Sequence, residues 1–318
     1  MPKIVILERN TVGLDVSIDR LSQLGEIIIY PNSSAENAGA RIGDADIVIA
    51  NKCLLNAETL KDATQVKLIC EFATGYDNVD LEYCRARDIK VANVRNYSTD
   101  AVAQHTFALC FYILNKLRHY DSYVKSGEYG KQSGFSNFDL PFHELAGKTW
   151  GIVGMGHIGS RVANVASAFG CRVIFFSPTG KSKCTEYRRV EFDELLIESD
   201  FLSLHCPLSD LTRGLIDYPA LTKMRASAIL INVARGPVVN DEDLYRALDE
   251  NIIAGAGLDV TGTEPMRDSN PLSRFTDSNR LIITPHNAWA SIEARNRVVE
   301  ETYENIAAFL RGEERNLV

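Results

Sequence analysis

Three residues that follow predicted strands have side chains suited to chemistry: one can bind a carboxylate, and the other two can transfer a proton. Arg235 lies in Asn232-Val-Ala-Arg-Gly-Pro237, and its guanidinium can hold a carboxylate through two parallel hydrogen bonds. His286 and Glu264 follow two other predicted strands, and a carboxylate beside a histidine stabilises the charged form that donates a proton. The competing interpretations are a surface arginine and a packed structural histidine, because the sequence alone does not show which residues meet.

A glycine-rich run near the middle of the chain indicates a dinucleotide site. Gly154, Gly156 and Gly159 form G-x-G-x-x-G between a predicted strand at 148–153 and a predicted helix at 160–169. A strand at 172–176 completes a βαβ unit, in which the glycines allow a tight turn, close approach of a pyrophosphate and close helix–strand packing. The amino terminus of the helix then offers N–H groups to the phosphates. Glycines that serve only turns are the competing interpretation.

The elements that position these residues alternate between strand and helix over the whole chain of 318 residues. The pattern predicts an α/β protein with two domains, each a doubly wound, mostly parallel sheet. A helical, strongly apolar stretch at 99–116 predicts a helix buried between domains or subunits. The segment 120–145 lacks clear periodicity and is typical of an interface arm or a lid. The other predicted strands lie at 4–7, 27–30, 47–50, 66–71, 90–92, 201–205, 228–232, 254–260 and 280–284. The other predicted helices lie at 17–23, 80–87, 241–247 and 291–310.

Composition excludes several classes of function. The net charge is −8 with no basic run, which argues against nucleic-acid binding as the main activity. The first residues run directly into a predicted strand and no segment reaches the length of a membrane span, so we expect neither a signal peptide nor a membrane anchor. Seven scattered cysteines without C-x-x-C spacing predict reduced thiols in a cytoplasmic protein and no metal site.

Taken together, the motifs resemble those of the D-isomer-specific 2-hydroxyacid dehydrogenases over essentially the full length. The resemblance implies NAD(P)-dependent transfer of hydride between the cofactor and C2 of a small 2-keto acid. It also implies a flavodoxin-like substrate domain from residues 1–98 and 287–318, and a Rossmann nucleotide domain at 99–286. The helix 99–116 would link the domains, and the arm 120–147 would form a homodimer. The matching motifs are 74–80, 154–159, 205–208, 232–237, 257–260, 263–265 and 285–286.

The resemblance also implies roles for individual residues. Arg235 would bind the carboxylate and polarise the C2 carbonyl, His286 would supply the proton, and Glu264 would keep His286 charged. Backbone N–H groups of Thr74 and Gly75 would bind the carboxylate as well. Lys52 is either a further substrate contact or a solvated lysine, and Trp289 is expected to contribute to specificity. The implied cofactor-binding residues are Gly154, Gly156, His157, Ile158, Gly159, Ser177, Pro178, Lys181, His205, Cys206, Pro207, Thr212, Val233, Ala234 and Asp259.

Two features narrow the expected reaction. Trp289, together with residues 97–100 and 104–105, resembles the glycerate dehydrogenases, also called hydroxypyruvate reductases, so the expected products are D-glycerate or glycolate. Ser177 occupies the position at which NAD enzymes usually carry an acid for the ribose 2′-hydroxyl, and Lys181 and Lys183 follow it. NADP(H) is therefore expected to be accepted and slightly preferred, although Ser177 is also compatible with NAD. The alternative function is a nucleotide-sensing, corepressor-like binding protein on the same fold.

Overall fold

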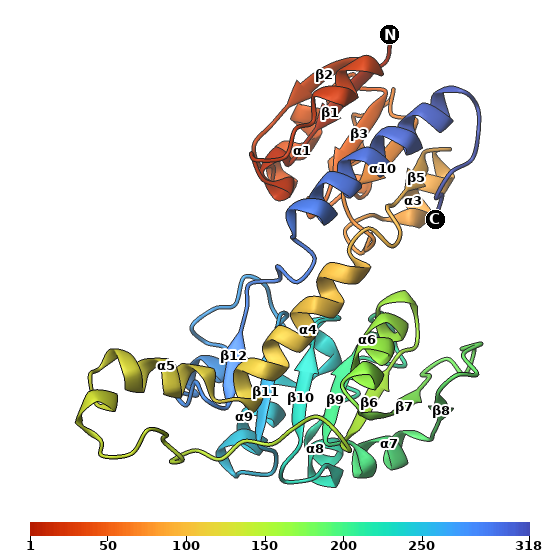
Figure 1. Ribbon diagram of the computed structural model, residues 1–318. Helices are drawn as coiled ribbons and strands as arrows, with labels where there is room; N and C mark the ends of the chain where they lie inside the picture. Colours follow the sequence, from red (N-terminus) through yellow and green to blue (C-terminus); the bar gives the residue numbers. More distant parts are fainter. The chain divides into compact units, whose positions relative to one another are not determined.

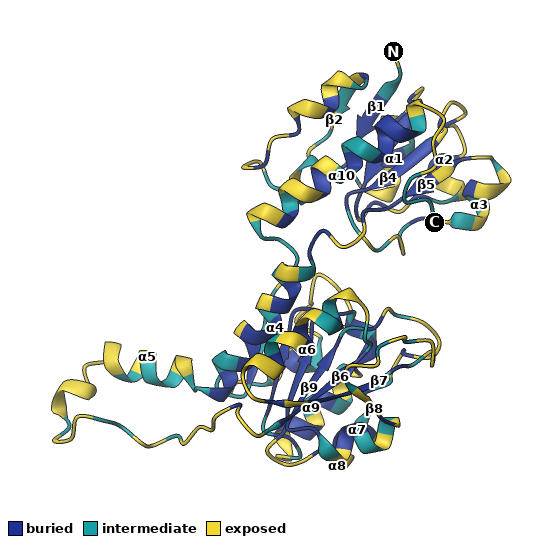
Figure 2. Ribbon diagram, turned by 45° about the vertical axis from the view of Figure 1, so that its right-hand side comes forward, coloured by how far each residue is buried: buried dark blue, intermediate teal, exposed yellow.

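The computed structural model describes residues 1–318, which form two compact units (Figure 1). The terminal unit consists of Met1–Ser98 and Ala290–Val318, and the central unit of Thr99–Trp289. No helix combines the length and the apolar character needed to cross a membrane. In both units the strands form the buried centre and the outward faces of the helices are exposed (Figure 2).

The terminal unit is built on a five-stranded parallel sheet with the order β2-β1-β3-β4-β5. This order confirms the predicted flavodoxin-like, doubly wound arrangement. Strands β3 and β4 are buried along their whole length, as expected for central strands of a covered parallel sheet. Its strands and helices are β1 Lys3–Ile6, β2 Glu26–Ile29, β3 Ile47–Ala50, β4 Leu68–Glu71, β5 Lys90–Ala92, α1 Ala35–Ile42, α2 Ala57–Leu60, α3 Leu81–Ala86 and α10 Ile292–Leu310.

The central unit contains a seven-stranded parallel sheet with the order β12-β11-β10-β9-β6-β7-β8. The strand order reverses between β6 and β9, and ligands of open α/β sheets bind at such a switch point. The Rossmann arrangement expected from the sequence is confirmed. Its elements are β6 Thr149–Val153, β7 Arg172–Phe176, β8 Arg188–Arg189, β9 Phe201–Leu204, β10 Ile229–Asn232, β11 Gly255–Leu258, β12 Leu281–Ile283, α4 Thr99–Leu114, α5 Leu117–Lys125, α6 His157–Ala168, α7 Phe192–Glu198, α8 Tyr218–Lys223 and α9 Asp241–Asp249.

Helix α4 packs on the sheet of its own unit, against α6 and strands β10, β11 and β12. This packing accounts for much of the apolar surface from which burial between domains or subunits was predicted. Phe107 lies 4.7 Å, centroid to centroid, from the ring of Trp150 in β6. Helix α4 also lies close to β11 because Gly257 has no side chain: a Cβ there would come within 2.8 Å of Leu109.

The helical stretch predicted at 17–23 is a 3-10 helix, Asp19–Gln23. Two smaller expectations were wrong. The segment 120–145, expected to be irregular, begins within helix α5 and becomes irregular only beyond Lys125. Helix α6 begins at His157, three residues before the predicted start, so Gly159 lies in its first turn. The other 3-10 helices are Arg9–Val12, Tyr129–Lys131, Gly236–Val238 and Pro271–Arg274.

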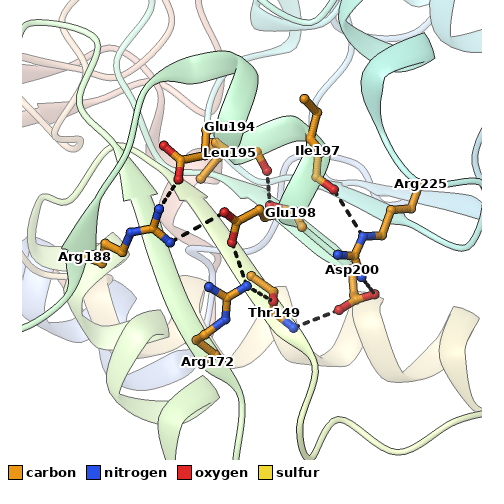
Figure 3. A network of polar contacts seen from close by, with 10 residues as sticks. Thr149, Arg172, Arg188, Glu194, Leu195, Ile197, Glu198, Asp200 and Arg225 are labelled. Carbon is orange, nitrogen blue, oxygen red and sulfur yellow. Dashed lines mark hydrogen bonds and ion pairs between the residues drawn. The ribbon is translucent and has the colours of Figure 1, made fainter.

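A polar network closes the amino-terminal edge of the central sheet (Figure 3). Asp200, which precedes β9, accepts a hydrogen bond from the backbone N–H of Thr149 at 2.9 Å and pairs with Arg225 at 2.9 Å. Arg172 donates to the Thr149 hydroxyl at 2.9 Å and to Glu198 at 2.7 Å. These groups tie together the starts of neighbouring strands. In open α/β sheets ligands bind at the opposite, carboxyl-terminal edge.

Candidate functional site

The glycine-rich loop between β6 and α6 has the shape required for a dinucleotide. Gly154 has a φ of +92°, and a Cβ there would lie 2.8 Å from the carbonyl oxygen of His205. A Cβ on Gly159 would lie 2.1 Å from the carbonyl oxygen of Gly154. A Cβ on Gly156 would instead meet nothing within 4 Å. Gly154 and Gly159 are therefore required by the fold, whereas Gly156 leaves open space at the amino terminus of α6, which suits a pyrophosphate.

A half-buried histidine, His205, lies beside this loop. The indole N–H of Trp150 donates to Ser203 Oγ at 2.9 Å, and Ser203 Oγ lies 3.0 Å from His205 Nε2. Burial lowers the pKa of His205 to about 3, so the ring is neutral. Its other ring nitrogen, Nδ1, is buried and has no hydrogen-bond partner within the protein.

The end of β7 carries no acidic side chain. Ser177 follows the strand, is buried, and its Oγ accepts a long hydrogen bond of 3.4 Å from the N–H of Ser182. Lys181 and Lys183 of the same loop are exposed. Arg189 approaches the loop from β8 and donates to the carbonyl oxygen of Gly180 at 2.8 Å. The surroundings of Ser177 are therefore basic, which is compatible with a ribose carrying a phosphate.

His286 and Glu264 meet directly. Nδ1 of His286 lies 2.6 Å from Oε2 of Glu264, and Oε1 of Glu264 accepts a hydrogen bond from the N–H of Thr261 at 3.1 Å. The hydrogen bond to Oε1 thus holds the Glu264 carboxylate in place, and Oε2 orients the imidazole of His286. Because Nδ1 is committed to Glu264, Nε2 is the nitrogen that remains to exchange a proton with a ligand.

The loop that carries His286 is anchored by Asp259. Its carboxylate, only 1% exposed, accepts hydrogen bonds from the N–H groups of Asn287 at 3.0 Å and Ala288 at 2.8 Å, and from the Thr284 hydroxyl at 2.6 Å. His286 has a φ of +52°, an unfavourable region for a residue with a Cβ. The surrounding hydrogen bonds hold it there, including one from the Trp289 indole N–H to the His286 carbonyl oxygen at 2.9 Å.

Arg235 lies on the next loop along the sheet, after β10. Its backbone carbonyl accepts a hydrogen bond from Asn232 at 3.0 Å, and its Nη1 donates to the carbonyl oxygen of Ala234 at 2.9 Å. The following residue, Gly236, passes so close to the loop of Glu264 that a Cβ would fall 1.8 Å from the carbonyl oxygen of Thr261. The backbones that carry Arg235 and Glu264 are therefore in direct contact.

The predicted substrate residues of the terminal unit follow β3 and β4. Lys52 comes two residues after β3, and its side chain is exposed. Thr74 and Gly75 follow β4, and Thr74 is fixed by two hydrogen bonds, from its hydroxyl to the carbonyl oxygen of Val94 at 2.6 Å and from Asn93 to its own carbonyl oxygen at 2.7 Å. These residues lie at the carboxyl-terminal edge of the terminal sheet.

The structure gives several predicted cofactor residues an internal role. The Asp259 carboxylate accepts hydrogen bonds from the His286 loop. The Thr212 hydroxyl donates to the carbonyl oxygen of Pro207 at 2.7 Å and so holds the loop after His205. The remaining predicted positions lie at these same strand ends: His157 and Ile158 in the first turn of α6, Pro178 and Lys181 after β7, Cys206 and Pro207 after β9, and Val233 and Ala234 after β10.

The roles of two supporting residues were not predicted from the sequence. His105, which entered there only as part of the resemblance, places Nε2 2.9 Å from the Thr284 hydroxyl, beside Asp259. Asp241 accepts hydrogen bonds from the Gly262 N–H at 2.9 Å and from Asn270 at 2.7 Å, and so fixes the loop before Glu264. Both act across long separations in sequence, and no local spacing marks them.

Comparison with known proteins places this geometry in a family. Residues 107–288 match the family model of the D-isomer specific 2-hydroxyacid dehydrogenase NAD-binding domain. The chain is 36% identical to a hydroxypyruvate reductase from Blautia hydrogenotrophica, with 99% of each chain covered. It is 36% identical to a glycerate dehydrogenase from Methylorubrum extorquens, with 99% of this chain and 98% of the relative covered.

The chain belongs to the D-isomer-specific 2-hydroxyacid dehydrogenase family. Among solved structures, an acyclic imino acid reductase in complex with NADPH and D-Arg superposes with a TM-score of 0.89 at 30% identity, and the match covers 99% of both chains. The protein is therefore an oxidoreductase of this family with an NAD(P)-binding domain, as the resemblance of its motifs predicted.

A substitution at Gly156 tests the predicted cofactor site without disturbing the fold. Gly156→Ala adds a methyl group into open space, so the melting temperature of the free protein should stay within about 2 °C of the parent. The same methyl group would occupy the approach of the pyrophosphate, so the Kd for NADPH and NADH should rise about tenfold or more, as measured by quenching of protein fluorescence.

Gly130→Ala is the matched control, since a Cβ there also meets nothing within 4 Å but lies in the arm. It should leave both the melting temperature and the cofactor Kd unchanged. An unchanged Kd in Gly156→Ala would remove this glycine from the cofactor site.

Proposed function

We propose that this dehydrogenase reduces a small 2-keto acid to the D-2-hydroxy acid with NAD(P)H, and that hydroxypyruvate and glyoxylate are its substrates. The products would be D-glycerate and glycolate. The observation that carries the proposal is the contact of 2.6 Å between His286 Nδ1 and Glu264 Oε2 at a strand end. Relatives named hydroxypyruvate reductase, glycerate dehydrogenase and glyoxylate reductase, at 36–39% identity, support the choice of substrates.

The substrate carboxylate is assigned to Arg235 and to the terminal unit. The guanidinium of Arg235 offers two parallel hydrogen bonds to the carboxylate and polarises the neighbouring C2 carbonyl. Backbone N–H groups of Thr74 and Gly75 bind the carboxylate as well, and the ammonium of Lys52 favours substrates with an oxygen at C3. Trp289 contributes an apolar surface, because its indole N–H is already engaged by the His286 carbonyl oxygen.

His286 supplies the proton of the reaction. When bound, the reduced nicotinamide supplies hydride to C2. The carbonyl π electrons move to the oxygen, and Nε2 of protonated His286 donates a proton to that oxygen, which yields the hydroxyl group and a neutral imidazole. Glu264 stabilises the protonated ring before the transfer, and solvent returns the proton to His286 afterwards.

The cofactor is assigned as NADPH with NADH as a second substrate. A carboxylate at the end of β7 would repel a 2′-phosphate, whereas Ser177 does not, and Lys181 and Arg189 add positive charge to the same loop. The similar imino acid reductase was solved with NADPH, which supports this assignment.

The arm is assigned to a homodimer. It extends away from the central sheet in both views and carries exposed aromatic side chains, with Phe135 90% and Phe138 84% exposed (Figures 1 and 2). Exposed aromatic side chains on one segment are typical of a surface that is covered in an assembly.

A substrate panel with both cofactors tests the proposal. Steady-state reduction of hydroxypyruvate, glyoxylate, pyruvate and a bulkier 2-keto acid should give the highest kcat/KM for one of the first two, and a higher value with NADPH than with NADH. A large preference for NADH would contradict the assignment based on Ser177. Failure to turn over any of these acids would contradict the proposed activity and favour a nucleotide-binding protein without catalysis.

Replacing His286 should separate catalysis from cofactor binding. His286→Gln keeps a polar side chain but removes the proton donor, so kcat for reduction should fall by roughly two to four orders of magnitude. The Kd for NADPH should stay within about twofold, because the glycine-rich loop is untouched. A near-normal kcat would exclude His286 as the acid.

Replacing Glu264 should slow the proton transfer. In Glu264→Gln the amide oxygen can still accept the Nδ1–H bond, but the negative charge beside the ring is lost. The kcat for reduction should therefore fall about tenfold or more, while the Kd for NADPH stays within about twofold. Steady-state kinetics with saturating cofactor is the measurement, and a near-normal kcat would contradict the role of the pair.

A further inference from the structure

A buried carboxylate of the terminal unit, Glu8, holds a loop that the proposed function uses. Glu8 follows β1 and is 6% exposed. Its Oε2 accepts hydrogen bonds from three successive backbone N–H groups, those of Asn51, Lys52 and Cys53, at 2.9, 2.9 and 2.8 Å. Successive amides directed at one point form an anion-binding concavity, and here the anion is a side chain of the protein itself.

The same network reaches the loop after β4. Nδ2 of Asn78 donates to the carbonyl oxygen of Cys53 at 3.0 Å and to Oε1 of Glu71 at 3.2 Å. The backbone continues the connection, since the N–H of Leu55 donates to the carbonyl oxygen of Asn78 at 2.8 Å. The loop of Lys52 and the segment of Thr74 and Gly75 are therefore joined into one structure.

Glu71, the last residue of β4, explains how two acids share this space. Its side chain has no exposed surface, and Oε2 has no hydrogen-bond partner in the protein. Burial raises the pKa of Glu71 to about 8; the Asn78 hydrogen bond and the Lys52 charge oppose the increase, and the Glu8 charge adds to it. Burial thus favours the protonated form of Glu71, and the three amides of residues 51–53 donate to Glu8 and not to Glu71.

We propose that Glu8 is a positioning residue for substrate binding: it holds the loop that carries Lys52 and, through Asn78, ties it to the segment that carries Thr74 and Gly75. The inference rests on the proposed function, because it takes these residues as the ones that bind the keto acid. Loss of Glu8 leaves three amides without their acceptor and frees the loop to adopt other conformations. Arg235 and His286 belong to the central unit and are unaffected, so substrate affinity changes more than the chemical step.

The test compares Glu8→Ala with Glu8→Gln and with a matched control. Asp46→Ala is the control, because Asp46 accepts a hydrogen bond from the N–H of Lys3 at 2.9 Å, at the opposite edge of the same sheet. KM and kcat for hydroxypyruvate with saturating NADPH, the Kd for NADPH and the melting temperature are measured for each full-length protein. If the parent prefers another keto acid, that acid is used.

In Glu8→Ala, KM should rise about tenfold or more, while kcat changes less than about threefold and the Kd for NADPH is unchanged. Glu8→Gln should recover most of the affinity, since an amide oxygen can accept the same three hydrogen bonds. Asp46→Ala should lower the melting temperature without changing KM. An unchanged KM in Glu8→Ala, or an equal increase in Asp46→Ala, would overturn the inference.

If Glu8→Ala does not fold, Asn78→Ala decides the question. It removes the bridge between the two loops and leaves Glu8 in place, so KM should rise about threefold or more with little change in kcat. An unchanged KM there would also overturn the inference. An active parent with these negative results contradicts only the role of Glu8, whereas a parent inactive on all keto acids contradicts the proposed function and, with it, the inference.

Discussion

The buried carboxylate of Asp259 is the interaction on which the proposed catalytic geometry depends. It accepts two backbone N–H groups and one hydroxyl from residues 284–288, and these bonds hold His286 at a φ that its side chain disfavours. A carboxylate that receives several donors in a dry environment is well stabilised, and it imposes one conformation on the segment that donates to it. The contact between His286 and Glu264 is possible because the backbone beneath the histidine cannot relax.

The terminal unit uses the same physical device. Glu8 accepts N–H groups from the loop 51–53, and Asp259 accepts N–H groups from the loop 284–288. Each acid is buried and follows one parallel strand, and the loop that it holds follows another. At the amino-terminal edges, Asp46 and Asp200 accept N–H groups at the start of β1 and β6. Buried or half-buried carboxylates thus hold backbone N–H groups at both edges of both sheets. Only those at the carboxyl-terminal edges hold loops with residues assigned to the reaction.

Much of the architecture could be predicted from local patterns. Apolar runs separated by helical segments predicted two parallel sheets, and the glycines of 154–159 predicted the turn before α6, because only glycine fits where a Cβ would strike backbone. Local patterns failed where a partner distant in sequence decides the outcome. The apolar surface of α4 did not reveal that β10–β12 would cover it, and the two-residue strand β8 has no apolar pattern of its own.

The sequence by itself determined the family, the succession of strands and helices along the chain and the residue types at the strand ends, because motif spacing and hydrophobic periodicity are local properties of the chain. Arg235, Glu264 and His286 could be named from these alone. Only the tertiary structure decided that Glu264 faces Nδ1 of His286 and that Glu8 accepts the N–H groups of residues 51–53. Hydrogen bonds between residues more than twenty positions apart depend on how strands are placed side by side, which no local pattern encodes.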